Sequence, residues 1–133
     1  MKLVIKKLLN EHLFDGESKE QIDLLNKFVN FTGKYLGIKP PKIHLQFNRE
    51  GLVTTAAYGN NHVKIYAKDR ASVDIMRSIA HELVHMLQDQ EGRLEQKHHD
   101  DNNEAGSPIE NEANAKAGEI MRKFGEEYPE IYI

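Results

Sequence analysis

Hydrophobic and polar residues alternate with two different periods along the chain, and these periods predict its secondary structure. Residues 18–36 place apolar side chains three or four positions apart, which is typical of an amphipathic helix that Gly37 would end. Residues 42–47 alternate between polar and apolar side chains, which is typical of a half-buried strand. Residues 1–16 are ambiguous, because they fit either a short strand at Leu3–Ile5 or a frayed helix.

The next two patterns predict a β-hairpin followed by the strongest helix of the chain. Residues 52–58 and 62–67 are expected to form two strands joined by a three-residue loop. Residues 72–90 carry a wide apolar stripe at helical spacing, and Gly92 stands where such a helix would end. The stripe consists of Ile75, Met76, Ile79, Ala80, Leu83, Val84 and Leu87.

A polar segment then separates this helix from a second one. Residues 91–106 show no apolar periodicity, and we expect them to form a long loop. Ser107 and Pro108 open the second helix as its cap and its first residue, and Gly125 is its expected end. Because no repeat or linker divides the sequence, we expect residues 1–133 to form a single domain.

Composition and charge narrow the classes of function. The 18 Lys and Arg residues against 21 Asp and Glu give a net charge of −3, so we expect no nucleic-acid partner. Lys6 and Lys7 interrupt the apolar start of the chain, and no run reaches the ~18–20 apolar residues of a membrane span. We therefore expect a cytoplasmic protein with no membrane association. The chain has no Cys and seven His, so metal chemistry would need imidazole and carboxylate ligands.

A metal-binding motif lies inside the strongest helix. His81 and His85 are four residues apart, so that their imidazoles lie about 40° apart around the helix and one turn apart along it. Glu82 flanks this pair in an HExxH motif, where it would accept a proton from water without binding the metal itself. A solvent-exposed polar face would be the simpler explanation, but the surrounding residues are apolar. Burying these three side chains without a partner would cost several kcal/mol, which favours a zinc ion.

A catalytic zinc site needs a third protein ligand, and the second helix offers the best candidate. Glu110 has Asn114 four residues later, which could orient a ligating imidazole, and the small Ala113 between them would let two helices approach closely. Glu112 is a weaker candidate because its neighbour at the same spacing is Lys116. Glu110 also has a purely structural alternative, since a capping-box Glu can bind the backbone of the cap residue.

The remaining histidines are less suited to the site. His98 and His99 stay open as third ligands, although they stand next to two Asp residues in the polar segment. His12, His44 and His62 are expected to be surface residues.

The two motifs together resemble a known group of enzymes. His81-Glu82-x-x-His85, followed 25 residues after His85 by Glu110-x-x-Ala113-Asn114, resembles the gluzincin branch of the zincin metallopeptidases. Thermolysin, the CAAX-prenyl proteases and the ImmA/IrrE-type proteases carry similar second helices, although thermolysin has Asp where this chain has Asn114. The small size is also similar to that of phage-encoded and SprT-like HExxH proteins, which would make a phage-encoded origin consistent with the cytoplasmic location.

The resemblance covers residues 42–124 and implies an α+β, zincin-like fold. Such a fold has a small twisted mixed sheet with an antiparallel edge hairpin, packed on the HExxH helix and on a second, glutamate-bearing helix. A peptide substrate would add to the edge strand through main-chain hydrogen bonds.

Motif and resemblance together predict a zinc metallopeptidase that acts on peptide or protein substrates. Zn²⁺ would be held by His81, His85 and Glu110, with Glu82 as the general base. Two alternatives stay open: a zincin-fold metal-binding module with a binding or assembly role and little or no hydrolysis, and a structural zinc site that does not need Glu82. The first arises because no single residue stands out as the oxyanion stabiliser. The candidates for that role are Tyr128, Tyr132, His98 and Arg93.

Overall fold

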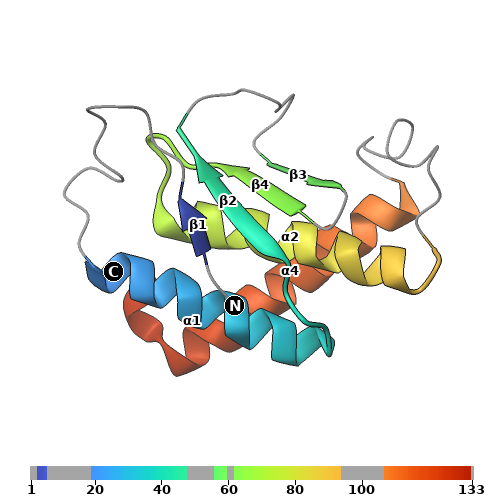
Figure 1. Cartoon of the computed structure of the whole chain (residues 1–133). Coiled ribbons are helices and arrows are strands. Elements are labelled where there is room, and N and C mark those ends of the chain that lie inside the picture. The colour runs from blue at the N-terminus through green and yellow to red at the C-terminus, as the bar shows by residue number, and fades with distance from the viewer. Residues whose placement is uncertain (1–2, 6–18, 48–55, 60–61, 94–106, 133) are drawn as a thin grey trace.

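A computed structural model describes residues 3–5, 19–47, 56–59, 62–93 and 107–132 of the chain (Figure 1). Helices and a mixed sheet together make this an α+β protein. The elements in chain order are β1 (Leu3–Ile5), α1 (Lys19–Leu36), β2 (Lys42–Gln46), β3 (Ala56–Gly59), β4 (His62–Tyr66), α2 (Ser72–Gln90), α4 (Pro108–Glu127) and the short 3-10 helix η1 (Pro129–Tyr132).

The sheet has the strand order β1-β2-β4-β3 within the described residues. Strands β1, β2 and β4 are parallel, and β3 pairs antiparallel with β4 at the edge. The predicted hairpin is therefore confirmed for β3 and β4, but its three-residue loop is wrong, because Gly59 belongs to β3 and pairs with His62. Residues 52–55 and 60–61 lie outside the described part. At the start of the chain, Leu3–Ile5 forms a strand beside β2, which confirms the short strand there, whereas residues 1–2 and 6–16 lie outside the described part.

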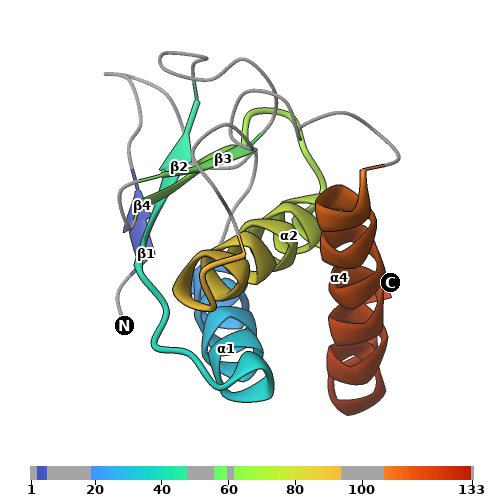
Figure 2. The same cartoon turned by 90° about the vertical axis from the view of Figure 1, so that its right-hand side faces the viewer.

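The helices α1, α2 and α4 all lie on one face of this sheet (Figure 2). Alternation along the strands explains which face they cover, because Ile43 and Leu45 of β2 and Val63 and Ile65 of β4 are fully buried. The residues between them point to the opposite face. There His44 Nε2 lies 3.2 Å from His62 Nδ1, so these two histidines are on the face opposite the helices.

The second predicted helix is longer than expected. We expected Gly125 to end it, but α4 continues to Glu127, and Gly125 is buried inside it. The Tyr128 N–H still donates to the Phe124 carbonyl at 2.8 Å, and the two rings stack with centroids 4.6 Å apart. This packing outweighs the roughly 1 kcal/mol that a glycine costs inside a helix. The segment that follows packs Ile131 against the core.

None of the helices in the described ranges combines the length and the apolar character that crossing a membrane would require.

Candidate metal centre

Helix α2 positions two imidazoles on the same side, one turn apart. It spans Ser72–Gln90, as its apolar stripe predicted, and most of that stripe is buried against the sheet and the other helices. The rings of His81 and His85 meet edge to face with centroids 4.7 Å apart. Their Nε2 atoms are 3.1 Å apart. The two residues belong to the same regular helix, one turn apart, so their Nε2 atoms point to the same place.

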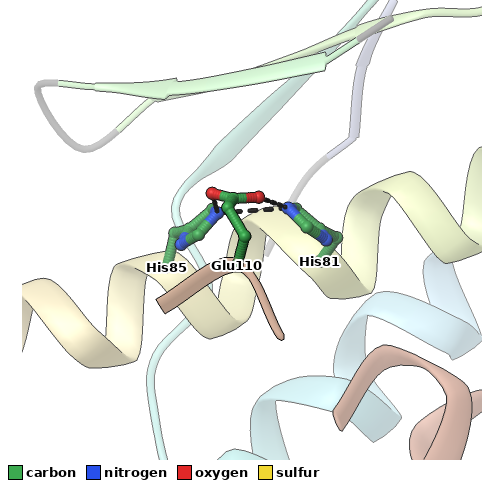
Figure 3. A group of neighbouring side chains, drawn as sticks. All are labelled: His81, His85 and Glu110. Carbon is green, nitrogen blue, oxygen red and sulfur yellow. Dashed lines mark hydrogen bonds and ion pairs between the residues drawn. The ribbon is translucent and has the colours of Figure 1, made fainter. Parts of the chain in front are cut away.

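Helix α4 brings a carboxylate to the same point. Ser107 caps this helix, since its Oγ accepts a hydrogen bond from the Glu110 N–H at 3.2 Å. The Glu110 side chain extends to α2, where Oε1 lies 2.9 Å from His81 Nε2 and Oε2 lies 2.8 Å from His85 Nε2 (Figure 3). The carboxylate of Glu110 therefore lies between the two imidazoles, where a third ligand is expected.

Glu112, one of the competing third ligands, has other partners. Glu112 accepts hydrogen bonds from Gln88 Nε2 at 2.8 Å and from Arg93 Nη2 at 2.9 Å. Arg93, then Gln88, lowers the pKa of Glu112 through these bonds. His98 and His99 lie outside the described residues, as does His12. Within the described part of the chain, His81, His85 and Glu110 are the group that could hold a metal ion, with one ligand atom of each within 4.8 Å of the others.

Each imidazole is also held by a second side chain. Asn114 forms a hydrogen bond with His81, as the spacing of four residues from Glu110 suggested. His85 Nδ1 lies 2.8 Å from Gln88 Oε1. The sequence did not single out Gln88. The available signal was a polar residue on the buried side of the helix, three residues after His85 and seven after His81.

The donor set of the centre suits a cation. Burial, followed by the nearby charge of His85, lowers the pKa of His81, which favours its neutral, metal-binding form. Two imidazole nitrogens and a carboxylate then face one another. Each of these three groups is an electron-pair donor, so a cation between them is a suitable partner for all three. Ligand nitrogens at ~2.0–2.1 Å from a tetrahedral zinc ion are roughly 3.3 Å apart, close to the 3.1 Å between the two Nε2 atoms. The three side chains therefore fit a divalent metal ion.

Glu82 completes the centre as a buried carboxyl group. It is only 6% exposed, and its Oε2 has no hydrogen-bond partner among the described residues. Burial, followed by the negative charge of Glu110, raises the pKa of Glu82 to about 8. A cation held by Glu110 and the two imidazoles would offset both effects. A buried carboxyl group without a partner beside a metal-binding triad is a feature that a purely structural site does not require.

Strand β3 lies alongside α2 at this centre. The Tyr58 hydroxyl donates to Asp89 Oδ2 at 2.8 Å, and Asp89 follows His85 by one helical turn. Figure 3 shows strands of the sheet passing over the three site side chains. The sequence predicted the edge strand, but it gave no sign that Tyr58 would link this strand to the helix that carries both histidines.

The four candidates for an oxyanion stabiliser gain no support from these contacts. Arg93 pairs with Glu91 and Glu112, and Tyr128 stacks on Phe124. His98 and the side chain of Tyr132 lie outside the described part.

Comparison with known proteins adds no relative. No family model, curated protein or solved structure matches the chain. The similarity to zincins therefore rests on the two sequence motifs and on the His81, His85 and Glu110 group that the fold brings together.

Proposed function

We propose that this protein is a zinc-dependent peptidase of a zincin-like type. The observation that supports the proposal is the convergence of His81, His85 and Glu110 from two helices, with one ligand atom of each within 4.8 Å of the others. Two imidazoles and a carboxylate are one of the ligand sets of catalytic zinc sites, which keep a further position open for water or substrate.

Zinc bound there supplies Lewis acidity for a scissile carbonyl group and lowers the pKa of water. His81 and His85 would hold the ion through their Nε2 atoms, and Glu110 would hold it through its carboxylate from α4. Glu82 takes the proton from the attacking water and returns it to the leaving amine. Its buried position, 6% exposed, keeps this carboxyl group out of bulk solvent between the two proton transfers.

Strand β3 is the proposed binding position for the peptide substrate. It is the last strand in the order of the described sheet, and it contacts α2 through Tyr58 and Asp89. An extended peptide added to this edge would form main-chain hydrogen bonds with β3 and would pass close to the three ligand side chains.

The second candidate is a metal-binding module that performs little or no hydrolysis. The contacts of Arg93 favour it, because this cation is already paired with two carboxylates and does not face the metal ligands as an oxyanion donor would. Both candidates keep the same ligands, so metal binding alone does not separate them.

Metal content and hydrolysis, measured together, test the proposal. We expect purified wild-type protein to contain about one zinc ion per chain, and His81→Ala to lose most of it. We expect Glu82→Gln to retain zinc and fold but to lose cleavage of a fluorogenic peptide library by a factor of at least ~10². Glu126→Gln, an exposed position of α4, is the matched control and should behave as wild type.

The results separate the candidates. Zinc binding with no hydrolysis in the wild type would favour the metal-binding module, whereas hydrolysis that persists in Glu82→Gln would contradict the proposed mechanism. Substoichiometric metal in both the wild type and His81→Ala would contradict the metal centre itself.

A further inference from the structure

Gln88 is a fully buried polar side chain that no step of the proposed reaction uses. It is 0% exposed, although it lies near the end of α2. Its carboxamide has three hydrogen-bond partners on two helices. Oε1 lies 2.8 Å from His85 Nδ1, while Nε2 lies 3.2 Å from the Ile109 carbonyl oxygen and 2.8 Å from Glu112 Oε1. A buried carboxamide therefore connects one metal ligand to the helix that carries another.

These partners determine which way the carboxamide faces. The Ile109 carbonyl and the Glu112 carboxylate can only accept hydrogen bonds, so the group between them must be the Gln88 NH₂. The oxygen of the amide then has to face His85. Arg93 strengthens this arrangement, because it donates to the other oxygen of Glu112 at 2.9 Å and keeps that carboxylate charged.

The direction of the amide determines in turn where His85 carries its proton. Gln88 Oε1 is an acceptor, so His85 Nδ1 must carry a hydrogen and donate it. A neutral imidazole with its proton on Nδ1 has its lone pair on Nε2. That Nε2 is the atom 2.8 Å from Glu110 Oε2 and 3.1 Å from His81 Nε2.

We infer that Gln88 is a positioning residue of the metal centre: its buried carboxamide fixes the Nδ1–H tautomer of His85 and joins this ligand to the first turn of α4. The inference rests on the proposed metal-binding function. The contact with the Ile109 carbonyl matters because Ile109 directly precedes Glu110. One side chain therefore orients the ring of His85 and also contacts the first turn of α4, the helix that presents the Glu110 carboxylate.

Only a carboxamide satisfies all three partners. A Glu at this position could accept from His85, but it would face the Glu112 carboxylate and could not donate to Ile109. An apolar residue would leave the buried His85 N–H without its acceptor, and the partly exposed Ile109 carbonyl and Glu112 carboxylate would lose this donor. The position therefore requires both an acceptor and a donor, which explains a polar residue on the buried side of α2.

The first test is the tautomer of His85 in the metal-free full-length protein, measured by long-range ¹H–¹⁵N NMR of the imidazole nitrogens. We expect a proton on Nδ1 in the wild type at neutral pH, with or without a second proton on Nε2 shared with Glu110. In Gln88→Met, which keeps the length of the side chain but removes its polar atoms, we expect a mixture of tautomers. A purely structural role of Gln88 would not change the proton's position. A wild-type ring with its proton on Nε2 alone would overturn the inference without any variant being needed.

The second test is the affinity for zinc, measured by competition with a chelator. We expect Gln88→Met to weaken binding about 10- to 100-fold, the range typical of groups that orient a ligating histidine. Gln90→Met, at an exposed position on the same helix, is the control and should bind as the wild type does. Equal affinity of wild type and Gln88→Met would overturn the inference while leaving the metal centre intact. A wild type that binds no zinc would contradict the centre and the inference together.

An exchange of side chains provides the rescue. Gln88→Glu alone should bind zinc more weakly, because it places two carboxylates side by side. The double variant Gln88→Glu/Glu112→Gln returns an amide donor to the pair while the carboxylate still accepts from His85. We expect it to regain at least part of the lost affinity and the Nδ1–H signal. A double variant no better than Gln88→Glu would show that the link from His85 to α4 does not act as inferred.

Discussion

Each of the two histidines at the candidate metal centre is contacted by a polar side chain of its own. Asn114 acts on the pKa of His81 through a side-chain hydrogen bond, and Gln88 Oε1 lies 2.8 Å from His85 Nδ1. Helix geometry places each of these polar side chains on the same face as a residue of the site. Glu110 and Asn114 are four residues apart on α4, and His85 and Gln88 are three apart on α2, so both spacings place two side chains on one face.

The prediction at this scale concerns Asn114. Asn114→Ala removes the hydrogen bond to His81 but leaves all three ligands in place, so we expect zinc affinity to fall by about tenfold while the fold is unchanged. The measurement is chelator competition, with circular dichroism as the check on folding. The same substitution at the exposed Asn30 of α1 is the control. An unchanged affinity in Asn114→Ala would mean that the ring of His81 is held by other contacts.

The sequence predicted the group that could hold a metal ion better than the side chains that contact this group. His81 and His85 could be recognised because they are one helical turn apart. Glu110 could be recognised because Asn114, four residues later, was suited to orient an imidazole. Gln88 could not be recognised, since its three partners come from two helices whose relative position is a property of the packed molecule. Glu112 was excluded as a ligand by the same packing, which directs it to Gln88 and Arg93.

At the scale of whole elements, the centre depends on how closely α2 and α4 approach. Ala113 is fully buried one turn after Glu110, where a larger side chain would separate the two helices. We expect Ala113→Leu to cost about 1–3 kcal/mol of stability and to weaken zinc binding, because the helix that presents Glu110 would be displaced. Thermal unfolding and chelator competition measure the two effects. Ala115→Leu, an exposed position of the same helix, should change neither.

The contact between β3 and α2 has its own signature at high pH. Burial, together with the hydrogen bond to Asp89, raises the pKa of Tyr58 from 10.0 to about 12. Because the pKa of Tyr58 is higher in the folded state than in the unfolded state, its protonated hydroxyl contributes to the free energy of unfolding. This contribution is fully present below pH 10 and is lost as the pH rises through about 12. Urea unfolding midpoints should therefore fall more steeply from pH 9 to 11.5 in the wild type than in Tyr58→Phe. Parallel decreases in both proteins would show that Tyr58 is not held by Asp89.

Periodicity predicted elements well where the pattern was long. The bounds of α2 match the expected 72–90, and Gly92 has the positive φ of 73° that suits the end of a helix. The end of α4 was missed because the stacking of Tyr128 on Phe124 is a tertiary contact. The parallel pairing of β2 with β4, which are not consecutive strands, was equally inaccessible, since local patterns do not specify neighbours across a sheet.

For the molecule as a whole, the proposed metal ion would be a link between helices that the chain already packs together. Its ligands come from α2 and α4, which are separated in sequence by residues 91–107. Unfolding separates these ligands, so the folded state binds the metal much more tightly than the unfolded chain does. Binding therefore stabilises the fold by mass action, in proportion to the logarithm of metal concentration over Kd.

This linkage gives a prediction that does not depend on the substrate. With free zinc at about 100 times Kd, the gain is ~2.7 kcal/mol, which for a chain of this length raises Tm by roughly 10 °C. Differential scanning fluorimetry with and without zinc should show that increase in the wild type, and a chelator should reverse it. His81→Ala should show little or no shift, whereas Glu82→Gln should keep the full one, because Glu82 is not a ligand. An equal response of wild type and His81→Ala would place the zinc elsewhere on the chain.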